Sequence, residues 1–254
     1  MSLIYEPKGK AREYSPLALN VYTLGCDHAC QYCYCKDGRK WGDVAKRRNL
    51  IGLVGEAQQA NRQVMLSFMS DPYCKAEREH RNTRYALSVL SGYRCSVAIL
   101  TKGGMRCLDD LHAFRAWPDG RIKVGASLTF WTDYRSLQVE PGAALPSERI
   151  EALKILHEEG VQTWASIEPV IDELESLHVI YDSLQFVDGY KVGKLNHRKS
   201  TVDWQAFVVK AVSMIRGAGR KLYVKRDLQP FAPVGFLTPE ECDPETLTLP
   251  DRPM

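Results

Sequence analysis

The stretch LGCDHACQYC, residues 24–33, places three cysteines, Cys26, Cys30 and Cys33, in one short segment. A fourth cysteine, Cys35, follows two positions later. Clustered thiolates are soft ligands that select iron–sulfur clusters, zinc or copper(I). Three thiolates on a 4Fe–4S cluster leave one iron without a protein ligand and open to a small molecule. Because Cys35 lies too close to Cys33 to reach the fourth corner of the same cluster, the spacing favours a three-cysteine iron–sulfur site.

Two other interpretations of this segment stay open. The same three thiols would complete a structural tetrahedral zinc site with either Cys35 or His28. Alternatively, all of these cysteines are free thiols in a loop. Zinc staples usually join two knuckles that are separated by a longer stretch, and a 254-residue chain needs no staple. We therefore prefer the iron–sulfur interpretation.

The composition is that of an ordinary globular protein, with 44% hydrophobic and 26% charged residues. The 254 residues suffice for one large domain or two small ones. No run of about 18 apolar residues is present, which argues against a membrane span. The start, MSLIYEPKGKAREYSP, lacks the apolar region of a secretory signal, so we expect a cytoplasmic protein without a membrane partner. Since the cytoplasm is reducing, its eight cysteines indicate metal binding or catalysis rather than disulfides.

Short apolar runs alternate with amphipathic segments along the chain. The predicted strands are 19–24, 64–69, 95–101, 122–130, 162–170, 185–193 and 221–226. The predicted helices are 43–61, 77–91, 108–115, 146–160, 172–183 and 203–216. Repeated β-α units with nearly continuous apolar strands indicate an α/β fold with a parallel sheet, either open or closed into a barrel. In both architectures the functional residues follow the carboxyl ends of the strands and share one mouth.

Placed directly after the first predicted strand, the pattern C-x3-C-x-(aromatic)-C resembles the radical S-adenosylmethionine (SAM) superfamily. The matching residues are Cys26, Cys30, Tyr32 and Cys33. The resemblance implies a partial (β/α)6 barrel, which we assign to residues 1–226. The proline content of segment 227–254 separately predicts an extended C-terminal tail packed on the barrel. The same resemblance implies a 4Fe–4S cluster whose open iron chelates SAM. Reduction by a flavodoxin- or ferredoxin-type partner would then cleave SAM to methionine and a 5′-deoxyadenosyl radical that abstracts hydrogen from a substrate.

The resemblance also implies which residues contact SAM. Asp71, after the second predicted strand, would receive the amino group, and Lys102 would bind the carboxylate, with Ser70 as a neighbouring contact. Ser127 and Thr129, two apart on one strand, would bind the ribose or the carboxylate. The remaining expected contacts are Tyr32, which would face the adenine or shield the cluster, and Glu168, which would meet ribose hydroxyls or substrate. The alternatives are an ordinary turn at Ser70–Asp71, a solvated Lys102, structural strand hydroxyls and a loop salt bridge at Glu168.

Within the superfamily, CQYCYC, SDPY, LTK and GASLT most resemble the spore photoproduct lyase-like branch, whose founding members repair a thymine dimer in DNA. Those lyases carry a hydrogen-donating cysteine just before the Ser-Asp pair, where this chain has Met69. A thioether has no S–H hydrogen to donate. Either Cys35 or Cys74 takes over, with Tyr34 as a further candidate catalytic residue, or the enzyme does not perform this repair. We favour the absence of repair.

Basic residues gather in segments predicted near the mouth, although the net charge is only +3. KVGKLNHRK (191–199) and GRKLYVKR (219–226) are rich in lysine and arginine, and segment 36–48 has six basic residues against two acidic ones. A basic rim suits a phosphate-bearing partner such as nucleic acid or a nucleotide. The candidate substrate contacts are Lys191, Asn196, Lys225 and Arg226. The alternative is a set of dispersed, solvated lysines.

The favoured function is hydrogen abstraction from a thymine-derived or otherwise modified base in nucleic acid, as in isomerisation of an amino-acid-decorated thymine in hypermodified DNA. Thymine-dimer repair and peptide modification are alternatives within the same superfamily. A zinc-stapled nucleic-acid-binding module without catalysis and a ferredoxin-like electron carrier are alternatives of other classes. Cys242 is the only cysteine of the C-terminal region, which argues against a second cluster there.

Overall fold

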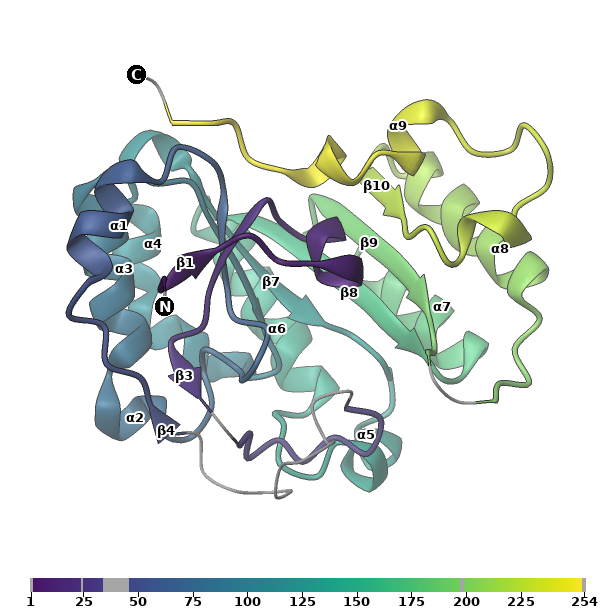
Figure 1. Cartoon of the computed structure of the whole chain (residues 1–254). Helices are drawn as coiled ribbons and strands as arrows, with labels where there is room; N and C mark the ends of the chain where they lie inside the picture. Colours follow the sequence, from purple (N-terminus) through teal and green to yellow (C-terminus); the bar gives the residue numbers. More distant parts are fainter. Residues whose placement is uncertain (1, 24, 34–45, 197–198, 253–254) are drawn as a thin grey trace.

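The computed structural model describes residues 2–23, 25–33, 46–196 and 199–252. Its main sheet has eight strands in the order β1-β2-β5-β6-β7-β8-β9-β10 (Figure 1). These strands are β1 (Ile4–Tyr5), β2 (Leu17–Leu19), β5 (Val64–Leu66), β6 (Val97–Thr101), β7 (Ile122–Ser127), β8 (Gln162–Val170), β9 (Gly189–Lys194) and β10 (Lys221–Val224). Only β1 pairs antiparallel, with β2, and all other neighbours are parallel. No described strand pairs β10 with β1 or β2, so the sheet is a partial barrel, and the predicted parallel α/β fold is confirmed.

Helices cover the outer face of the curved sheet (Figure 1). They are α1 (Leu53–Gln59), α2 (Glu77–His80), α3 (Asn82–Gly92), α4 (Leu111–Arg115), α5 (Asp133–Val139), α6 (Pro146–Glu158), α7 (Glu173–Ser183), α8 (Trp204–Gly217) and α9 (Pro239–Cys242). All six residues of β7 are buried, because a covered parallel strand is enclosed on both faces. This two-sided burial explains why the strands read as continuous apolar runs rather than alternating ones.

The first predicted strand, 19–24, is wrong in its extent. β2 ends at Leu19, and the chain then forms β3 (Tyr22–Thr23), which pairs antiparallel with β4 (Lys46–Arg47) outside the main sheet. The side chain of Asn20 causes the break, because its Oδ1 accepts the backbone N–H groups of Phe68 and Met69 at 2.8 and 3.1 Å. The same bonds end β5 at Leu66 rather than at the predicted residue 69.

Other predicted boundaries differ for local reasons. The predicted helix 43–61 is reduced to α1 within its described part, 46–61, and residues 43–45 lie outside the described residues. Helix α5 and the short 3-10 helix η1 (Gly9–Glu13) were not predicted, since both are too short for a clear helical period. β8, by contrast, has the predicted bounds.

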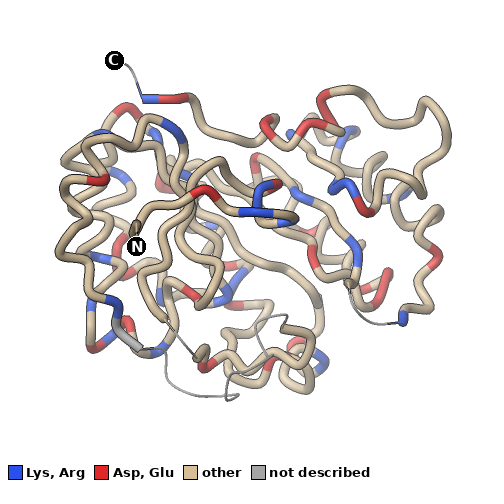
Figure 2. Tube along the Cα trace, in the orientation of Figure 1, with Lys and Arg blue, Asp and Glu red and all other residues tan. Residues whose placement is uncertain are grey.

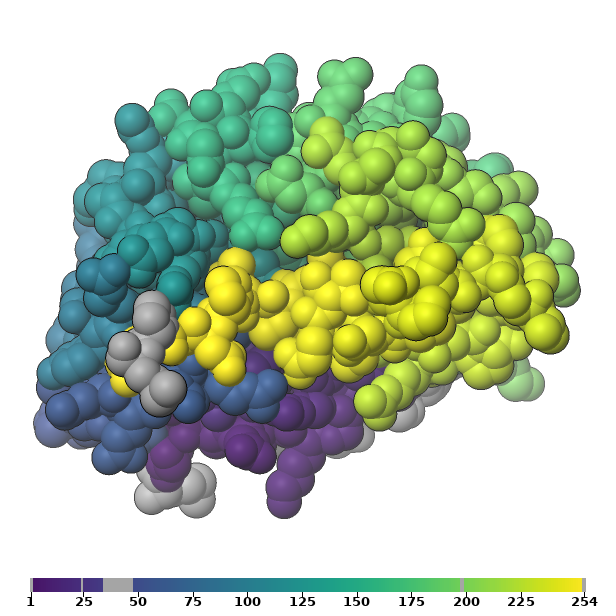
Figure 3. Space-filling view, turned by 90° about the horizontal axis from the view of Figure 1, so that it is seen from above, coloured from purple at the N-terminus to yellow at the C-terminus, as the bar shows by residue number. Residues whose placement is uncertain are grey.

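The C-terminal segment lies as a yellow band across one face of the molecule (Figure 3), and its contacts are with residues at the amino ends of the parallel strands. Buried Lys123, near the start of β7, donates its Nζ to the carbonyl of Leu247. Leu249 N donates to Gln63 Oε1 at 2.9 Å, and Ser96 Oγ donates to the carbonyl of Pro250 at 2.5 Å. The tail thus covers one end of the barrel, which leaves the carboxyl end for the site. No helix in the described ranges is long and apolar enough to cross a membrane.

Candidate active site

A cavity of about 640 Å³ lies at the carboxyl end of the sheet, between the cysteine segment and the strand ends. Most predicted site residues line it: Cys26, Cys30, Tyr32, Cys33, Ser70, Asp71, Lys102, Ser127, Glu168, Asn196 and Lys225. Four predicted residues do not line it: Cys74, Thr129, Lys191 and Arg226. Tyr34 and Cys35 lie outside the described residues. Residues far apart in sequence therefore share one wall because parallel strands end at one edge.

The cysteine segment is a pair of tight turns. Ala29 N donates to the carbonyl of Cys26 at 3.3 Å, and Cys33 N donates to that of Cys30 at 3.1 Å. Burial raises the pKa of the Cys26 thiol to about 12 and that of Cys30 to about 11. In the described ranges no three His, Cys, Asp or Glu side chains converge as a single metal ion requires. A cluster takes one thiolate on each of three separate irons, so this donor set fits it better than one zinc ion.

His28, the alternative zinc ligand, has both ring nitrogens engaged. Its Nε2 lies 3.0 Å from Nη2 of Arg106, and its Nδ1 lies 3.5 Å from Oδ2 of Asp71. A guanidinium has only donors, so Nε2 accepts and the proton sits on Nδ1, facing Asp71. Burial lowers the pKa of His28. The imidazole therefore braces the loop instead of completing a zinc site.

Asp71, which follows β5, forms hydrogen bonds to the carboxyl end of β6. Its carboxylate accepts hydrogen bonds from Thr101 Oγ1 at 2.5 Å, Lys102 N at 2.7 Å and Tyr73 N at 2.8 Å. With these three hydrogen bonds and the Nδ1 proton of His28 facing the same carboxylate, little capacity remains for a ligand ammonium. The neighbouring Ser70 Oγ, in contrast, is buried in the cavity wall and has no hydrogen-bond partner among the described residues. A buried hydroxyl without a partner is costly, so this atom fits a ligand donor or acceptor in the cavity.

The side chain of Tyr32 is held by two residues that do not themselves line the cavity. Its hydroxyl donates to Oε1 of Glu140 and lies 3.3 Å from Oγ1 of Thr129. Burial alone would raise the pKa of Glu140, but the charges of Arg149 and Lys102 and the Tyr32 hydrogen bond hold it at about 2. Lys102 Nζ lies 5.6 Å from the centre of the Tyr32 ring. Thr129 is fully buried and lies beyond the end of β7, so it is not on one strand with Ser127 as predicted, and its hydroxyl supports Tyr32.

Glu168 and Lys225 form an ion pair in the opposite wall, with Nζ 2.6 Å from Oε2. Glu168 also accepts from Tyr14 at 2.5 Å and from Asn196 Nδ2 at 3.2 Å. Lys10 Nζ donates to Asn196 Oδ1 at 2.5 Å. Tyr14 and Lys10 were missed because nothing in the residues around η1 marks them. Their position is decided only when η1 folds against the strand ends.

The predicted basic mouth needs correction. Lys191 is fully buried and donates to the backbone carbonyls of Glu13 and Tyr14 at 2.5 and 3.3 Å. Burial and the charge of Lys225 lower the pKa of Lys191 to about 7. Arg226 is exposed outside the cavity, and Lys221 begins β10 at the opposite end of the strand.

Five lysines nevertheless line the cavity: Lys8, Lys10, Lys102, Lys194 and Lys225. Along the described part of the trace, basic and acidic residues are interspersed (Figure 2). The positive charge at the site thus comes from four separate segments, and the runs 191–199 and 219–226 contribute only Lys194 and Lys225 to it.

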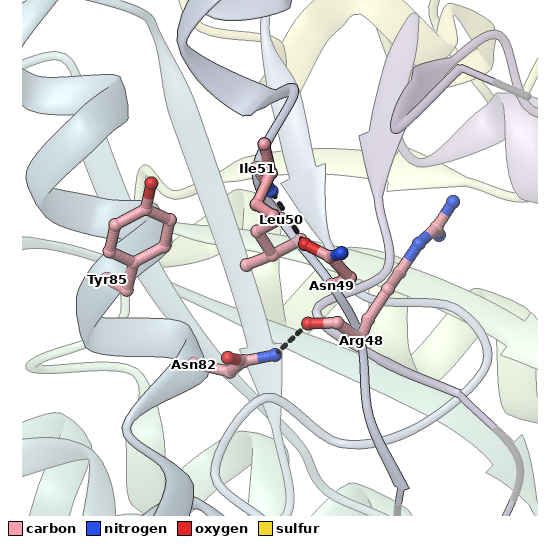
Figure 4. Close-up of a pocket in the computed structure, with 6 residues that line it drawn as sticks. All are labelled: Arg48, Asn49, Leu50, Ile51, Asn82 and Tyr85. Carbon is pink, nitrogen blue, oxygen red and sulfur yellow. Dashed lines mark hydrogen bonds between the residues drawn. The ribbon is translucent and has the colours of Figure 1, made fainter.

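Cys74 is fully buried and does not line the cavity, so the structure does not bring this candidate hydrogen donor to the site. Met69, which stands where the lyases have their cysteine, does line it. A second cavity, of about 420 Å³, lies between residues 48–51 and α3 (Figure 4). Its polar groups brace that segment, since Asn82 Nδ2 donates to the carbonyl of Arg48 at 2.9 Å, and no thiol or carboxylate of the described residues lines it.

An open, parallel α/β barrel with a C-x3-C-x2-C segment at the carboxyl ends of its strands defines the radical SAM fold. SuiB of Streptococcus suis bound to S-adenosylmethionine matches with a TM-score of 0.61 and 12% identity, over 82% of this chain and 50% of SuiB. A mutant spore photoproduct lyase with bound AdoMet and dinucleoside spore photoproduct matches with a TM-score of 0.58 and 15% identity, over 80% of this chain and 61% of the lyase. The predicted resemblance of fold is confirmed.

In sequence, the chain is 30% identical over 190 residues to the uncharacterized protein MJ0683 of Methanocaldococcus jannaschii. The alignment covers 72% of this chain and 71% of that protein. The chain therefore belongs to the same family as MJ0683. No family model matches the chain.

Proposed function

We propose that this protein is a radical SAM enzyme whose 4Fe–4S cluster is held by Cys26, Cys30 and Cys33. The single observation that carries the proposal is that these three cysteines line the same cavity as the polar residues at the strand ends. When bound, the cluster and SAM would supply a 5′-deoxyadenosyl radical for hydrogen abstraction from a substrate.

The residues of the chain would bind SAM and exclude water. Ser70 offers a buried hydroxyl to which no described residue bonds, and Lys102 offers a cation for the SAM carboxylate. Ser127, at the end of β7, offers a further hydroxyl to the cavity. The apolar residues Met65, Phe68 and Leu100 line the remaining wall, which would keep water and stray hydrogen donors from the reacting atoms.

Anaerobic reconstitution tests the enzyme assignment. We expect a brown protein with about four irons per chain that forms 5′-deoxyadenosine from SAM and dithionite. Replacement of any one of the three cluster cysteines by alanine should abolish both properties. Cys242→Ala is the matched control, because this cysteine belongs to the tail and does not line the cavity. A colourless protein with one bound zinc ion would contradict the proposal.

For the substrate, we propose a thymine-derived or modified base in nucleic acid that undergoes rearrangement or isomerisation. Lysines from separate segments around the cavity support a phosphate-bearing substrate. The match to a lyase structure with a bound dinucleoside photoproduct supports a nucleobase in such a fold. Met69 argues against thymine-dimer repair, because it offers no S–H hydrogen in the cavity.

Peptide modification is the second candidate, since the chain also matches SuiB bound to precursor peptide SuiA with a TM-score of 0.62. Substrate-dependent 5′-deoxyadenosine formation across nucleosides, modified DNA and peptides separates the two. Stimulation by modified DNA alone is the expected outcome, and stimulation by peptides alone would overturn the nucleic-acid proposal. A flavodoxin- or ferredoxin-type protein is the proposed reductant, tested by replacing dithionite with such a partner.

A further inference from the structure

One buried ion pair lies just outside the residues that line the cavity. It contacts the lining residue Tyr32 but not the cavity itself. Arg149, on α6, and Glu140, just after α5, are both completely buried, and Nη2 of Arg149 lies 2.6 Å from Oε2 of Glu140. A buried pair of this kind contributes little net stability compared with apolar residues of similar volume. Its geometry therefore suggests a role in fixing the placement of its neighbours.

Arg149 makes three separate contacts, each leading to a different predicted SAM-binding residue. Nη1 donates to the carbonyl of Ser127 at 3.0 Å, which holds the end of β7. Through Glu140, which accepts from the Tyr32 hydroxyl, it holds the aromatic residue of the cysteine segment.

The third contact leads to Lys102. Nε of Arg149 donates to the carbonyl of Ala144 at 2.8 Å, and Ala144 N in turn donates to the carbonyl of Lys102 at 2.9 Å. Residues 139–144 also form backbone hydrogen bonds to the cysteine segment. Gln31 N donates to the carbonyl of Val139 at 2.8 Å, and Gly142 N donates to that of His28 at 3.0 Å.

We propose that Arg149 is a positioning residue of the cofactor site, which sets Tyr32, Lys102 and Ser127 in register with one another. This inference rests on the proposed function, because it concerns how the residues of that site are held. A planar guanidinium suits the role, since its donors point in fixed directions and three of them are used at once. A lysine at this position would keep the charge beside Glu140 but could not make all three bonds.

The test compares Arg149→Lys with the wild type in two measurements. In the reconstituted protein, R149K should retain about four irons and bind SAM about tenfold more weakly. In the metal-free protein, amide hydrogen exchange should be faster in residues 28–32 and 101–103. Arg216→Lys is the matched control, because Arg216 makes a similar bond of 2.7 Å to Glu241 far from the cavity.

Wild-type SAM affinity and wild-type amide exchange in R149K would overturn the inference. If R149K does not fold, Tyr32→Phe tests the same network, since it keeps the ring and removes only the hydroxyl that bonds to Glu140 and Thr129. Y32F should then weaken SAM binding about fivefold, and an unchanged affinity would overturn the inference. A wild-type protein that binds neither iron nor SAM would refute the proposed function instead, while the amide-exchange comparison would still test the role of Arg149.

Discussion

Nζ of Lys225 lies 2.6 Å from Oε2 of Glu168 in the cavity wall, and the lysine side chain is only 2% exposed. The positive charge of Lys225 is thus already matched inside the protein. The sequence, where Lys225 stands in a basic run beside Arg226, does not reveal this partner.

Lys225→Met should destabilise the protein rather than abolish the attraction for phosphate. Removing one partner leaves the Glu168 carboxylate without its cation, which costs about 3 kcal/mol in the free energy of unfolding. Urea denaturation measures the loss. The double variant Glu168→Gln with Lys225→Met should recover most of it, and equal stability of K225M and wild type would show that the pair is unimportant.

Lys8 and Lys10 should differ in their effect on nucleic-acid binding. Both line the cavity, but Lys10 is bonded to Asp227 at 2.7 Å and to Asn196, whereas no side chain in the described ranges pairs with the ammonium of Lys8. Lys8→Ala should lower the slope of log affinity against log salt by about 1, and Lys10→Ala should lower it less. Binding of a single-stranded oligonucleotide over a salt series measures both slopes, with Lys221→Ala as a control from the opposite end of the sheet. Equal slopes for all three variants would contradict the proposal that lysines at the cavity bind the phosphates of the substrate.

Met69→Cys should introduce dimer repair that the wild type lacks. The substitution places an S–H group at a position that lines the cavity, where the wild-type thioether has no hydrogen to donate. Incubation of the reconstituted proteins with a dinucleoside spore photoproduct, followed by chromatography of thymine products, gives the comparison. Efficient reversal by the wild type would contradict the prediction that this protein does not repair thymine dimers.

Lys191 should make stability rise with pH above neutrality. Burial lowers its folded-state pKa to about 7, below its ordinary value of 10.5. Between these two values the unfolded chain holds a proton that the folded protein lacks, so raising the pH favours folding by up to about 1.4 kcal/mol per pH unit. This contribution is complete above pH 10.5 and is lost as the pH falls to about 7.

Lys191→Met removes this titration. The difference in unfolding free energy between wild type and K191M should therefore shift in favour of the wild type between pH 7 and pH 9, as measured by urea denaturation. A difference that stays constant over this range would mean that Lys191 keeps its proton in the folded protein.

Gly142→Ala should disturb the cysteine segment. A Cβ at this position would lie 1.8 Å from the carbonyl oxygen of Asp27, so the segment must move. We expect a large loss of bound iron after reconstitution and a loss of about 2 kcal/mol or more in unfolding free energy. Gly55→Ala in α1 is the control, because nothing lies within 4 Å of its added Cβ and alanine favours a helix. Full iron content in G142A would show that the contact is not needed.

Short-range sequence patterns predicted the order of the main strands and helices well. The alternation of apolar strands and amphipathic helices predicted the parallel order, and β8 has its predicted bounds because seven of its nine residues are buried. The first strand was overextended because Asn20 takes over hydrogen bonds that would otherwise continue the ladder to Phe68 and Met69. A single side chain that bonds to a distant strand leaves no trace in hydrophobic periodicity.

The three-cysteine segment, its position after the first strand and the parallel β-α order follow from residue spacing and periodicity, because these are local properties of the chain. Which charges remain available at the mouth depends on the folded arrangement. Lys225 meets Glu168, Lys191 turns into the barrel interior and Arg149 meets Glu140, each across a stretch of intervening sequence. A buried charge must find its partner in space, and that partner is set by which strand ends the fold brings to the same edge.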